Sequence, residues 1–341
     1  MKLLTARVRA RCRGRARWPG MMLVPAALAL LAGGCRVPGT AAPAAAVTRQ
    51  LTVAVVPGFA NAPLQLAVAS GLFTRQGLDV TVQTYQTVRQ AYAALASGQA
   101  DVIGGDYADL LYTEAQAHAR LRLIADGYDA VPGLLEVLTL PGSPVTAPQD
   151  LQGAAVATPP PDLAPFAADA PYNMETLATE AVLQSDGVSP SSIRWEAMPA
   201  SSMIGALRDH AVSAIVATQP YILQAESELG AVELLDACSG VTASLPLSGY
   251  FATAGIARRD GTALRSFRAA LNAATAASAQ PGTVRSVLRT LPGMSSRTAD
   301  LVTVGQYPTF LSTGQVQRVA DLMYGTGMVT STISVRSMVF R

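Results

Sequence analysis

The sequence predicts an α/β fold, with helices packed on a mostly parallel β-sheet. Short β-branched apolar runs alternate with helical stretches from Leu51 to Asp236, and this alternation is typical of right-handed βαβ units. Half of the 341 residues are hydrophobic, which is enough to bury the cores of about two domains. Only 14% are charged, and this composition excludes a coiled coil, a collagen and a disordered chain.

The first series of elements begins at Leu51. Each predicted strand is a short apolar or alternating run, and a Gly, Pro or polar turn separates it from the amphipathic helix that follows. The predicted strands are residues 51–56, 78–84, 100–105, 121–126 and 134–140, with helices at 62–73, 88–97 and 106–119.

A second series follows Pro144 and repeats the alternation. Its predicted strands are residues 153–158, 193–198, 211–217, 232–236 and 248–257, with helices near 173–186, 201–210 and 220–229; only helices are predicted beyond residue 257. The segments ALASGQADVIGG and ALRDHAVSAIVA repeat one pattern, in which the end of a helix is followed by a turn and a short strand. Gly98 and His210 therefore occupy equivalent turns, where a left-handed residue closes the helix.

The N-terminus has the layout of a secretory signal. Seven of the 25 basic residues lie in the first seventeen positions, and an apolar run from Met21 to Gly34 leads to Cys35. The run is too short for a membrane span of about 20 residues. We expect residues 1–34 to be a signal peptide of the lipoprotein type, Cys35 to carry a lipid, and the Ala/Pro-rich residues 35–50 to be a tether.

Cysteines and charges exclude several classes of protein. Cys238 is the single Cys expected in the mature chain, so no disulfide framework is possible. His118 and His210 have no Cys or second His at metal-ligand spacing, and we interpret both as structural. All 23 acidic residues lie beyond position 78, and no basic stripe follows the leader. We expect no cofactor, no metal and no nucleic-acid partner.

Four segments resemble, in order, the solute-binding proteins of ABC importers for nitrate, sulfonates and taurine. They are LTVAVVPGFANAPLQLAVASGLFTRQGLDVTV, ALASGQADV, PQDLQGAAVA and ALRDHAVSAIVATQPY, and the resemblance spans residues 51–339. His210 and Ser213 replace a Gly and an Asp of the family pattern, and Gln219 stands where Glu is frequent. The Pro-rich loop 159–171 is also atypical of the family.

The resemblance implies a periplasmic-binding-protein fold of type II, in which two α/β lobes are joined by two hinge strands. Lobe one would comprise residues 51–140 plus 247–341, and lobe two residues 141–246. The chain is similar to bacterial lipoproteins that are anchored outside the cytoplasmic membrane and act as monomers beside an ABC permease. Such a protein captures its solute in the cleft between the lobes, and the closed form engages the permease.

The ligand site of an open α/β sheet lies beyond the carboxyl ends of its strands. Applied to this chain, that rule predicts a mostly aromatic and neutral set suited to a small, partly apolar organic ligand. The set comprises Phe59, Asn61, Gln86, Thr87, Asp106, Tyr107, Thr158, Tyr172, Asn173, Gln219, Tyr221 and Tyr250. Asn61 and Asp106 have an alternative role as helix caps. As a ligand contact, Asp106 would oppose a simple anion and favour an amine.

Three functions stay open at this level. The first is capture of a sulfonate-, taurine-, nitrate- or pyrimidine-like solute for an importer. The second is a ligand-sensing ectodomain that signals through a partner. The third is an enzyme like the thiamine-pyrimidine synthases that share the fold, but the chain lacks their Cys-rich segment and has no GxSxG, HExxH, Walker or GxGxxG motif. We therefore expect a binding protein and not an enzyme.

Overall fold

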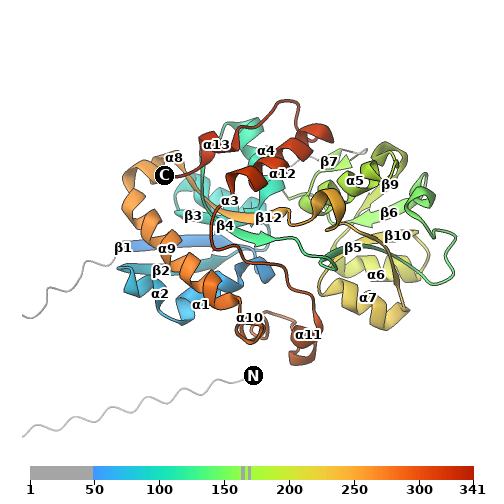
Figure 1. The fold of residues 1–341 in the computed structure, drawn as a ribbon, viewed down its shortest axis with the longest axis horizontal. Helices are drawn as coiled ribbons and strands as arrows, with labels where there is room; N and C mark the ends of the chain where they lie inside the picture. Colours follow the sequence, from blue (N-terminus) through green and yellow to red (C-terminus); the bar gives the residue numbers. More distant parts are fainter. Residues whose placement is uncertain (1–48, 163–165, 168–169) are drawn as a thin grey trace, which may run out of the picture. The chain divides into compact units, whose positions relative to one another are not determined.

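The computed structural model describes residues 49–162, 166–167 and 170–341 (Figure 1). The predicted signal peptide, residues 1–34, lies outside the described residues, and so do Cys35 and the tether as far as residue 48. Within the described residues, no helix combines the length and the apolar character needed to cross a membrane.

Two separate five-stranded sheets form the framework. The first has the order β2-β1-β3-β12-β4 and contains β2 (Leu78–Thr84), β1 (Arg49–Val55), β3 (Val102–Asp106), β12 (Pro246–Thr253) and β4 (Leu121–Asp129). The second has the order β11-β5-β10-β6-β9 and contains β11 (Val232–Asp236), β5 (Leu135–Thr139), β10 (Ala214–Thr218), β6 (Ala155–Thr158) and β9 (Arg194–Ala197). Each sheet and its helices form one lobe, which confirms the predicted fold class.

Both sheets are mixed, so the prediction of mostly parallel sheets was wrong. In the first sheet β1 runs parallel to β2 and β3, whereas β12 runs antiparallel to β3 and β4. In the second sheet β5 is antiparallel to β10 and β11. The reason is that β5 and β12 follow passages of the chain from one lobe to the other, and these passages do not make a βαβ crossover.

The chain passes between the lobes twice. It leaves the first sheet after Asp129 and enters the second at Leu135, and it returns between Asp236 and Pro246. Because β5 pairs in the second sheet, the first passage precedes the expected boundary at residue 140. The two passages are tied together, since Ala130 N donates to Leu245 O at 2.9 Å.

Helices cover both faces of each sheet (Figure 1). In lobe one, α1 (Ala62–Ala69), α2 (Leu72–Arg75) and α9 (Gly261–Ser278) lie on one face, and α3 (Val88–Ser97), α4 (Tyr107–Ala117) and α12 (Thr313–Gly325) on the other. In lobe two, α6 (Ala200–Arg208) and α7 (Tyr221–Leu229) lie on one face and α5 (Met174–Ser185) on the other. The remaining α-helices of the described residues are α8 (Ala254–Arg259), α10 (Pro281–Leu288), α11 (Ser296–Leu301) and α13 (Val335–Met338).

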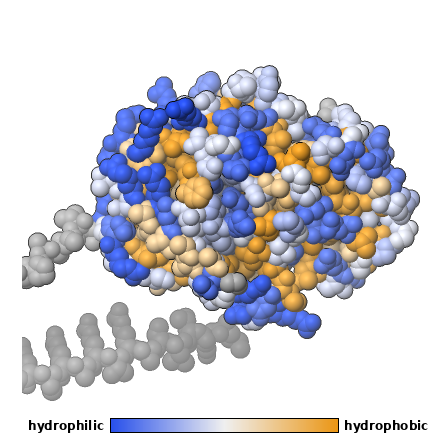
Figure 2. Space-filling view, in the orientation of Figure 1, coloured by the Kyte–Doolittle hydropathy of each residue, from blue (hydrophilic) through white to orange (hydrophobic). Residues whose placement is uncertain are grey.

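Apolar side chains account for this packing. Strand β5 is buried along its whole length, as expected for a strand covered on both faces. In lobe two, Met203, Leu207 and Ile222 of α6 and α7 pack with Ile215 of β10. The viewed face of the molecule is largely polar, with apolar patches across its middle (Figure 2).

Helix ends follow the local signals in the sequence. Thr87 accepts a hydrogen bond from Gln90 N and caps α3, and Gly98 ends that helix with φ +77°. His210 closes the equivalent turn after α6 with φ +56°. The predicted left-handed position of both residues is confirmed.

The segment after β12 is only partly strand. The sequence predicts a strand over residues 248–257, whereas β12 ends at Thr253 and α8 begins at Ala254. Thr253 caps α8 by accepting from Ile256 N at 3.2 Å. A Thr in an apolar run therefore ends the strand here.

Candidate functional site

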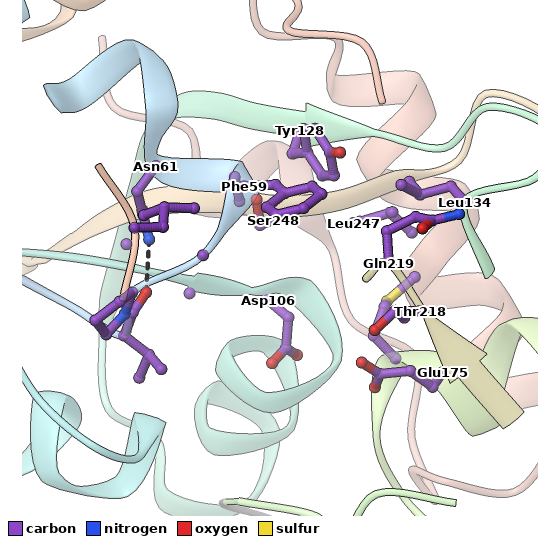
Figure 3. Close-up of a pocket in the computed structure, with 18 of the residues that line it drawn as sticks. Phe59, Asn61, Asp106, Tyr128, Leu134, Glu175, Thr218, Gln219, Leu247 and Ser248 are labelled. Carbon is purple, nitrogen blue, oxygen red and sulfur yellow. Dashed lines mark hydrogen bonds between the residues drawn. The ribbon is translucent and has the colours of Figure 1, made fainter. Parts of the chain in front are cut away.

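A cavity of about 810 Å³ lies between the two sheets and receives residues from both lobes. Its size is within the usual range for pockets that bind small molecules. The carboxyl ends of β1, β3 and β10 open onto it, as the rule for α/β sheets predicts. Figure 3 shows Phe59 after β1, Asp106 at the end of β3 and Thr218 at the end of β10 around a common space.

The loop after β1 forms one wall. Phe59 and Asn61 belong to the short helix η1 (Phe59–Asn61), and both line the cavity. Asn61 does not cap α1 with its side chain. Instead Asn61 Nδ2 donates to Val56 O at 2.6 Å (Figure 3), and Tyr307 Oη donates to Phe59 O at 2.9 Å. These bonds hold the loop in the shape that presents the Phe59 ring to the cavity.

Asp106 combines a structural role with a place on the cavity wall. One carboxylate oxygen caps α4 by accepting from Asp109 N at 2.7 Å. The residue also lines the cavity. Burial, together with the nearby Asp109 and Glu175 carboxyl groups, raises the pKa of Asp106 well above its ordinary value.

Lobe two contributes the opposite wall. Glu175 comes from the first turn of α5, and Thr218, Gln219 and Tyr221 come from the end of β10 and the start of α7. The pKa of Glu175 is raised, mainly by burial and then by Asp109 and Asp162. Gln219 Nε2 donates to Gly133 O at 3.4 Å, which orients the amide.

The strands near the passages between lobes form the floor. Tyr128, Leu134, Leu247, Ser248 and Tyr250 line the cavity there. Gly305 N donates to Tyr128 Oη at 2.6 Å, and the Tyr128 and Tyr307 rings are 5.1 Å apart. The aromatic side chains on this side are thus fixed by one another and by the backbone.

Six of the twelve residues predicted from the sequence line the cavity. They are Phe59, Asn61, Asp106, Gln219, Tyr221 and Tyr250. The predicted role of each as a ligand contact stays a prediction.

The other six lie elsewhere and are not among the lining residues. Thr87 caps α3, and Asn173 caps α5 while its Nδ2 donates to Pro159 O at 2.6 Å. Thr158 is fully buried against Thr176 at 3.0 Å. Tyr172 Oη donates to Gly327 O at 3.4 Å. Gln86 is exposed, next to Thr87.

Tyr107 lies behind the cavity wall. It is completely buried, and its Oη donates to Asp126 at 2.7 Å. A Cβ at Gly249 would come within 2.5 Å of this phenolic oxygen. Only a glycine at position 249 lets β12 pass this close to Tyr107. Tyr107 therefore supports the cavity wall from behind and is not among the lining residues.

Several lining residues were missed from the sequence. Glu175 was detectable, because it follows a recognised helix start at Asn173 by two residues. Leu134 begins a predicted strand, whereas Tyr128 and Leu247 lie just outside predicted strands, and no motif marks any of the three as a site residue. The loop after α10, residues 291–294, also lines the cavity, and no motif marks it.

The ionisable side chains of the described lining residues include acids but no bases. Asp106 and Glu175 line it, and none of the described lining residues is Lys, Arg or His. The described residues also contain no group of three or more His, Cys, Asp or Glu side chains that could hold a metal ion. The cavity is suited to non-covalent binding of a small molecule by apolar contacts and hydrogen bonds.

Solved structures with the same fold include proteins of known binding role. SsuA, the periplasmic aliphatic sulphonate binding protein of Escherichia coli, has 17% identity and a TM-score of 0.69, covering 86% of this chain and 97% of that chain. The alkanesulfonate-binding protein SsuA of Xanthomonas axonopodis pv. citri, solved bound to MOPS, has 19% identity and a TM-score of 0.65, covering 86% and 98%. The desulfurization enzyme DSZB has 15% identity and a TM-score of 0.64, covering 85% and 96%. No curated protein sequence gives a significant match.

Two α/β lobes, two passages between them and a cavity at their junction define a protein of the periplasmic-binding-protein fold. Residues 59–283 match the family model described as NMT1/THI5 like. The chain belongs to that family.

Proposed function

We propose that the protein captures a small organic solute outside the cytoplasm and delivers it to the permease of an ABC importer. The observation that carries this proposal is the cavity between the two sheets, to which both lobes contribute walls. A solute that contacts both walls stabilises the closed arrangement by its differential affinity, and a permease can recognise that arrangement. The two SsuA proteins, which share the fold, support this role.

A binding role accounts for the site better than catalysis does. The fold also serves the desulfurization enzyme DSZB, so the fold alone does not decide. In this chain Cys238 is fully buried and is not a lining residue. Burial raises the pKa of its thiol to about 12, so the thiolate is scarce at neutral pH. The described lining residues supply no His or Cys for covalent chemistry.

The proposal is tested by thermal shift of the purified protein against sulfonates, taurine, nitrate, pyrimidines and aromatic amines. We expect at least one solute to raise the melting temperature, because a ligand at 100 times its Kd adds about 2.7 kcal/mol of stability. Phe59→Ala and Gln219→Ala should weaken binding of that solute by at least about tenfold. Both should leave the unliganded melting temperature within about 5 °C of the native value, since neither residue is fully buried.

Gln83→Ala is the matched control, because Gln83 is exposed on β2 and is not a lining residue. It should bind the solute as the native protein does. A folded native protein that responds to no solute, or lining variants that bind as tightly as the Gln83 control, would contradict the proposal.

We further propose that Cys35 carries the lipid that holds the protein on the membrane. The support is the basic segment, the short apolar run and the small residues before this Cys. Cys35→Ser should move the protein from the membrane fraction to the soluble extracytoplasmic fraction, as measured by cell fractionation. Cys12→Ser, within the expected leader, should leave it on the membrane, and equal distribution of the two variants would refute the anchor.

A further inference from the structure

We propose that the solute is an organic cation, whose ammonium or amidinium group lies between Asp106 and Glu175 and whose apolar body packs on Phe59. This inference rests on the proposed function and narrows its ligand. It departs from the sulfonate ligands named for the similar solved structures.

The first argument is the placement of the two carboxyl groups. Asp106 belongs to lobe one at the end of β3, and Glu175 belongs to lobe two in the first turn of α5. Figure 3 shows their carboxyl groups directed toward one another across the cavity. The described lining residues include no Lys, Arg or His, so a sulfonate would find no positive side chain here and would lie beside two carboxyl groups.

The second argument concerns helix N-termini, which could otherwise bind an anion through free amides. Within the described residues, four helices begin at this cavity, α1, α4, α5 and α7. In α1, Ala62 N donates to Phe59 O and Pro63 has no N–H group. In α4 and α5 a side-chain cap takes one amide each. Asp109 N of α4 donates to Asp106, and Thr176 N of α5 donates to Asn173 Oδ1 at 2.7 Å. Three of these four helix N-termini are thus partly satisfied within the chain, and only α7 has neither a side-chain cap nor a Pro in its first turn.

The third argument is unfilled hydrogen-bonding capacity. Gln219 Oε1 is buried and has no hydrogen-bond partner among the described residues. Gln219 Nε2 donates to a carbonyl, which can only accept, so the atom left over is an acceptor. Tyr250, which is 3% exposed, lines the cavity with a hydroxyl that also lacks a partner within the described part of the chain. A ligand that donates N–H groups would satisfy Gln219.

The electrostatics agree with these contacts. Burial raises the pKa of both Asp106 and Glu175, so each carboxylate is unfavourable in the empty cavity. A bound cation would relieve that cost in both lobes together. The apolar wall of Phe59, Leu134 and Leu247 leaves room for a hydrocarbon or aromatic body beside the charged end.

The test compares three probes that share a benzene ring and differ in charge: benzamidine, benzamide and benzenesulfonate. Of the three probes, we expect only benzamidine to raise the melting temperature of the purified protein. Asp106→Asn and Glu175→Gln should each weaken benzamidine binding at least about tenfold, as expected for loss of a charged hydrogen bond. Asn retains the capping oxygen at position 106, so α4 should stay formed. Asp79→Asn, on the exposed side of β2, is the control and should bind benzamidine normally.

Four results would overturn the inference. If benzenesulfonate binds and benzamidine does not, the ligand is an anion, and the proposed importer function still stands. If Asp106→Asn and Glu175→Gln bind benzamidine as well as Asp79→Asn does, the cation lies elsewhere. If benzamidine does not bind while a neutral or anionic solute from the thermal-shift panel of the proposed function does, the ligand is not a cation. If no solute of that panel binds, the proposed function is contradicted as well.

Discussion

Phe267→Ala will lower the free energy of unfolding by about 3–5 kcal/mol, the usual cost of removing a buried Phe. Phe267 lies on α9 and is fully buried. Its ring stacks on Phe73 of α2 at 5.3 Å and meets the edge of Tyr250 on β12 at 5.8 Å. The substitution therefore leaves a cavity where a helix pair meets the first sheet, directly behind a lining residue of the ligand cavity.

Urea unfolding followed by circular dichroism measures this loss. Phe310→Ala is the matched control, because the Phe310 side chain is 70% exposed and its truncation should change stability by less than about 0.5 kcal/mol. A loss below about 1 kcal/mol at Phe267 would show that α9 is not packed on this sheet as described.

Glu180→Gln will stabilise the protein at pH 8 by about 3 kcal/mol and leave it unchanged at pH 4. Glu180 is buried on α5, and its Oε1 has no hydrogen-bond partner among the described residues. Burial raises the pKa of its carboxyl group to about 7. The unfolded chain ionises this group near its ordinary value of about 4.3.

The direction of the pH effect follows from the raised pKa. Below about pH 4 the group is protonated in both states and costs nothing. As the pH rises toward 7 the unfolded state releases the proton while the folded state retains it, so the native protein loses stability. Gln is neutral at every pH and has nearly the same shape, so the variant escapes this loss.

Urea unfolding at pH 4, 6 and 8 tests this prediction. Asp79→Asn removes an exposed carboxylate on β2 and should run parallel to the native protein. If Glu180→Gln also runs parallel to the native protein, the Glu180 carboxyl group is solvated and the described packing of α5 is incorrect.

Much of the framework could be predicted from the sequence because it depends on local signals. Strands could be predicted from runs of β-branched residues. The similarity of the two segments ALASGQADVIGG and ALRDHAVSAIVA predicted equivalent turns at Gly98 and His210. Which strands pair with one another could not be predicted from such local signals. Strand β5 looks like any buried strand in sequence, and nothing in its periodicity says that it pairs with β10 and β11. The expected boundary at residue 140 therefore came after this strand.

The site was predicted in part for a similar reason. Loops that follow strands in an α/β sheet could be located, and this placed Phe59, Asp106 and Gln219 at the cavity. Whether each side chain points into the cavity or into the core could not be predicted. Asp106 faces the cavity, but one residue later the chain turns into α4, which directs Tyr107 into the core. Glu175 follows a predicted helix start, but its position opposite Asp106 depends on how the two lobes pack, which no local signal in the sequence gives.

The cavity between the lobes is the ligand site of this protein if solute binding protects both of its walls. Hydrogen–deuterium exchange should be measured with and without the solute that gives the largest rise in melting temperature. Protection is expected in residues 56–61 and 104–106 of lobe one and in residues 218–221 of lobe two. Protection confined to the second hollow, which is lined by Arg49, Arg258 and Arg265, or absent from one of the two lobes, would contradict binding between them.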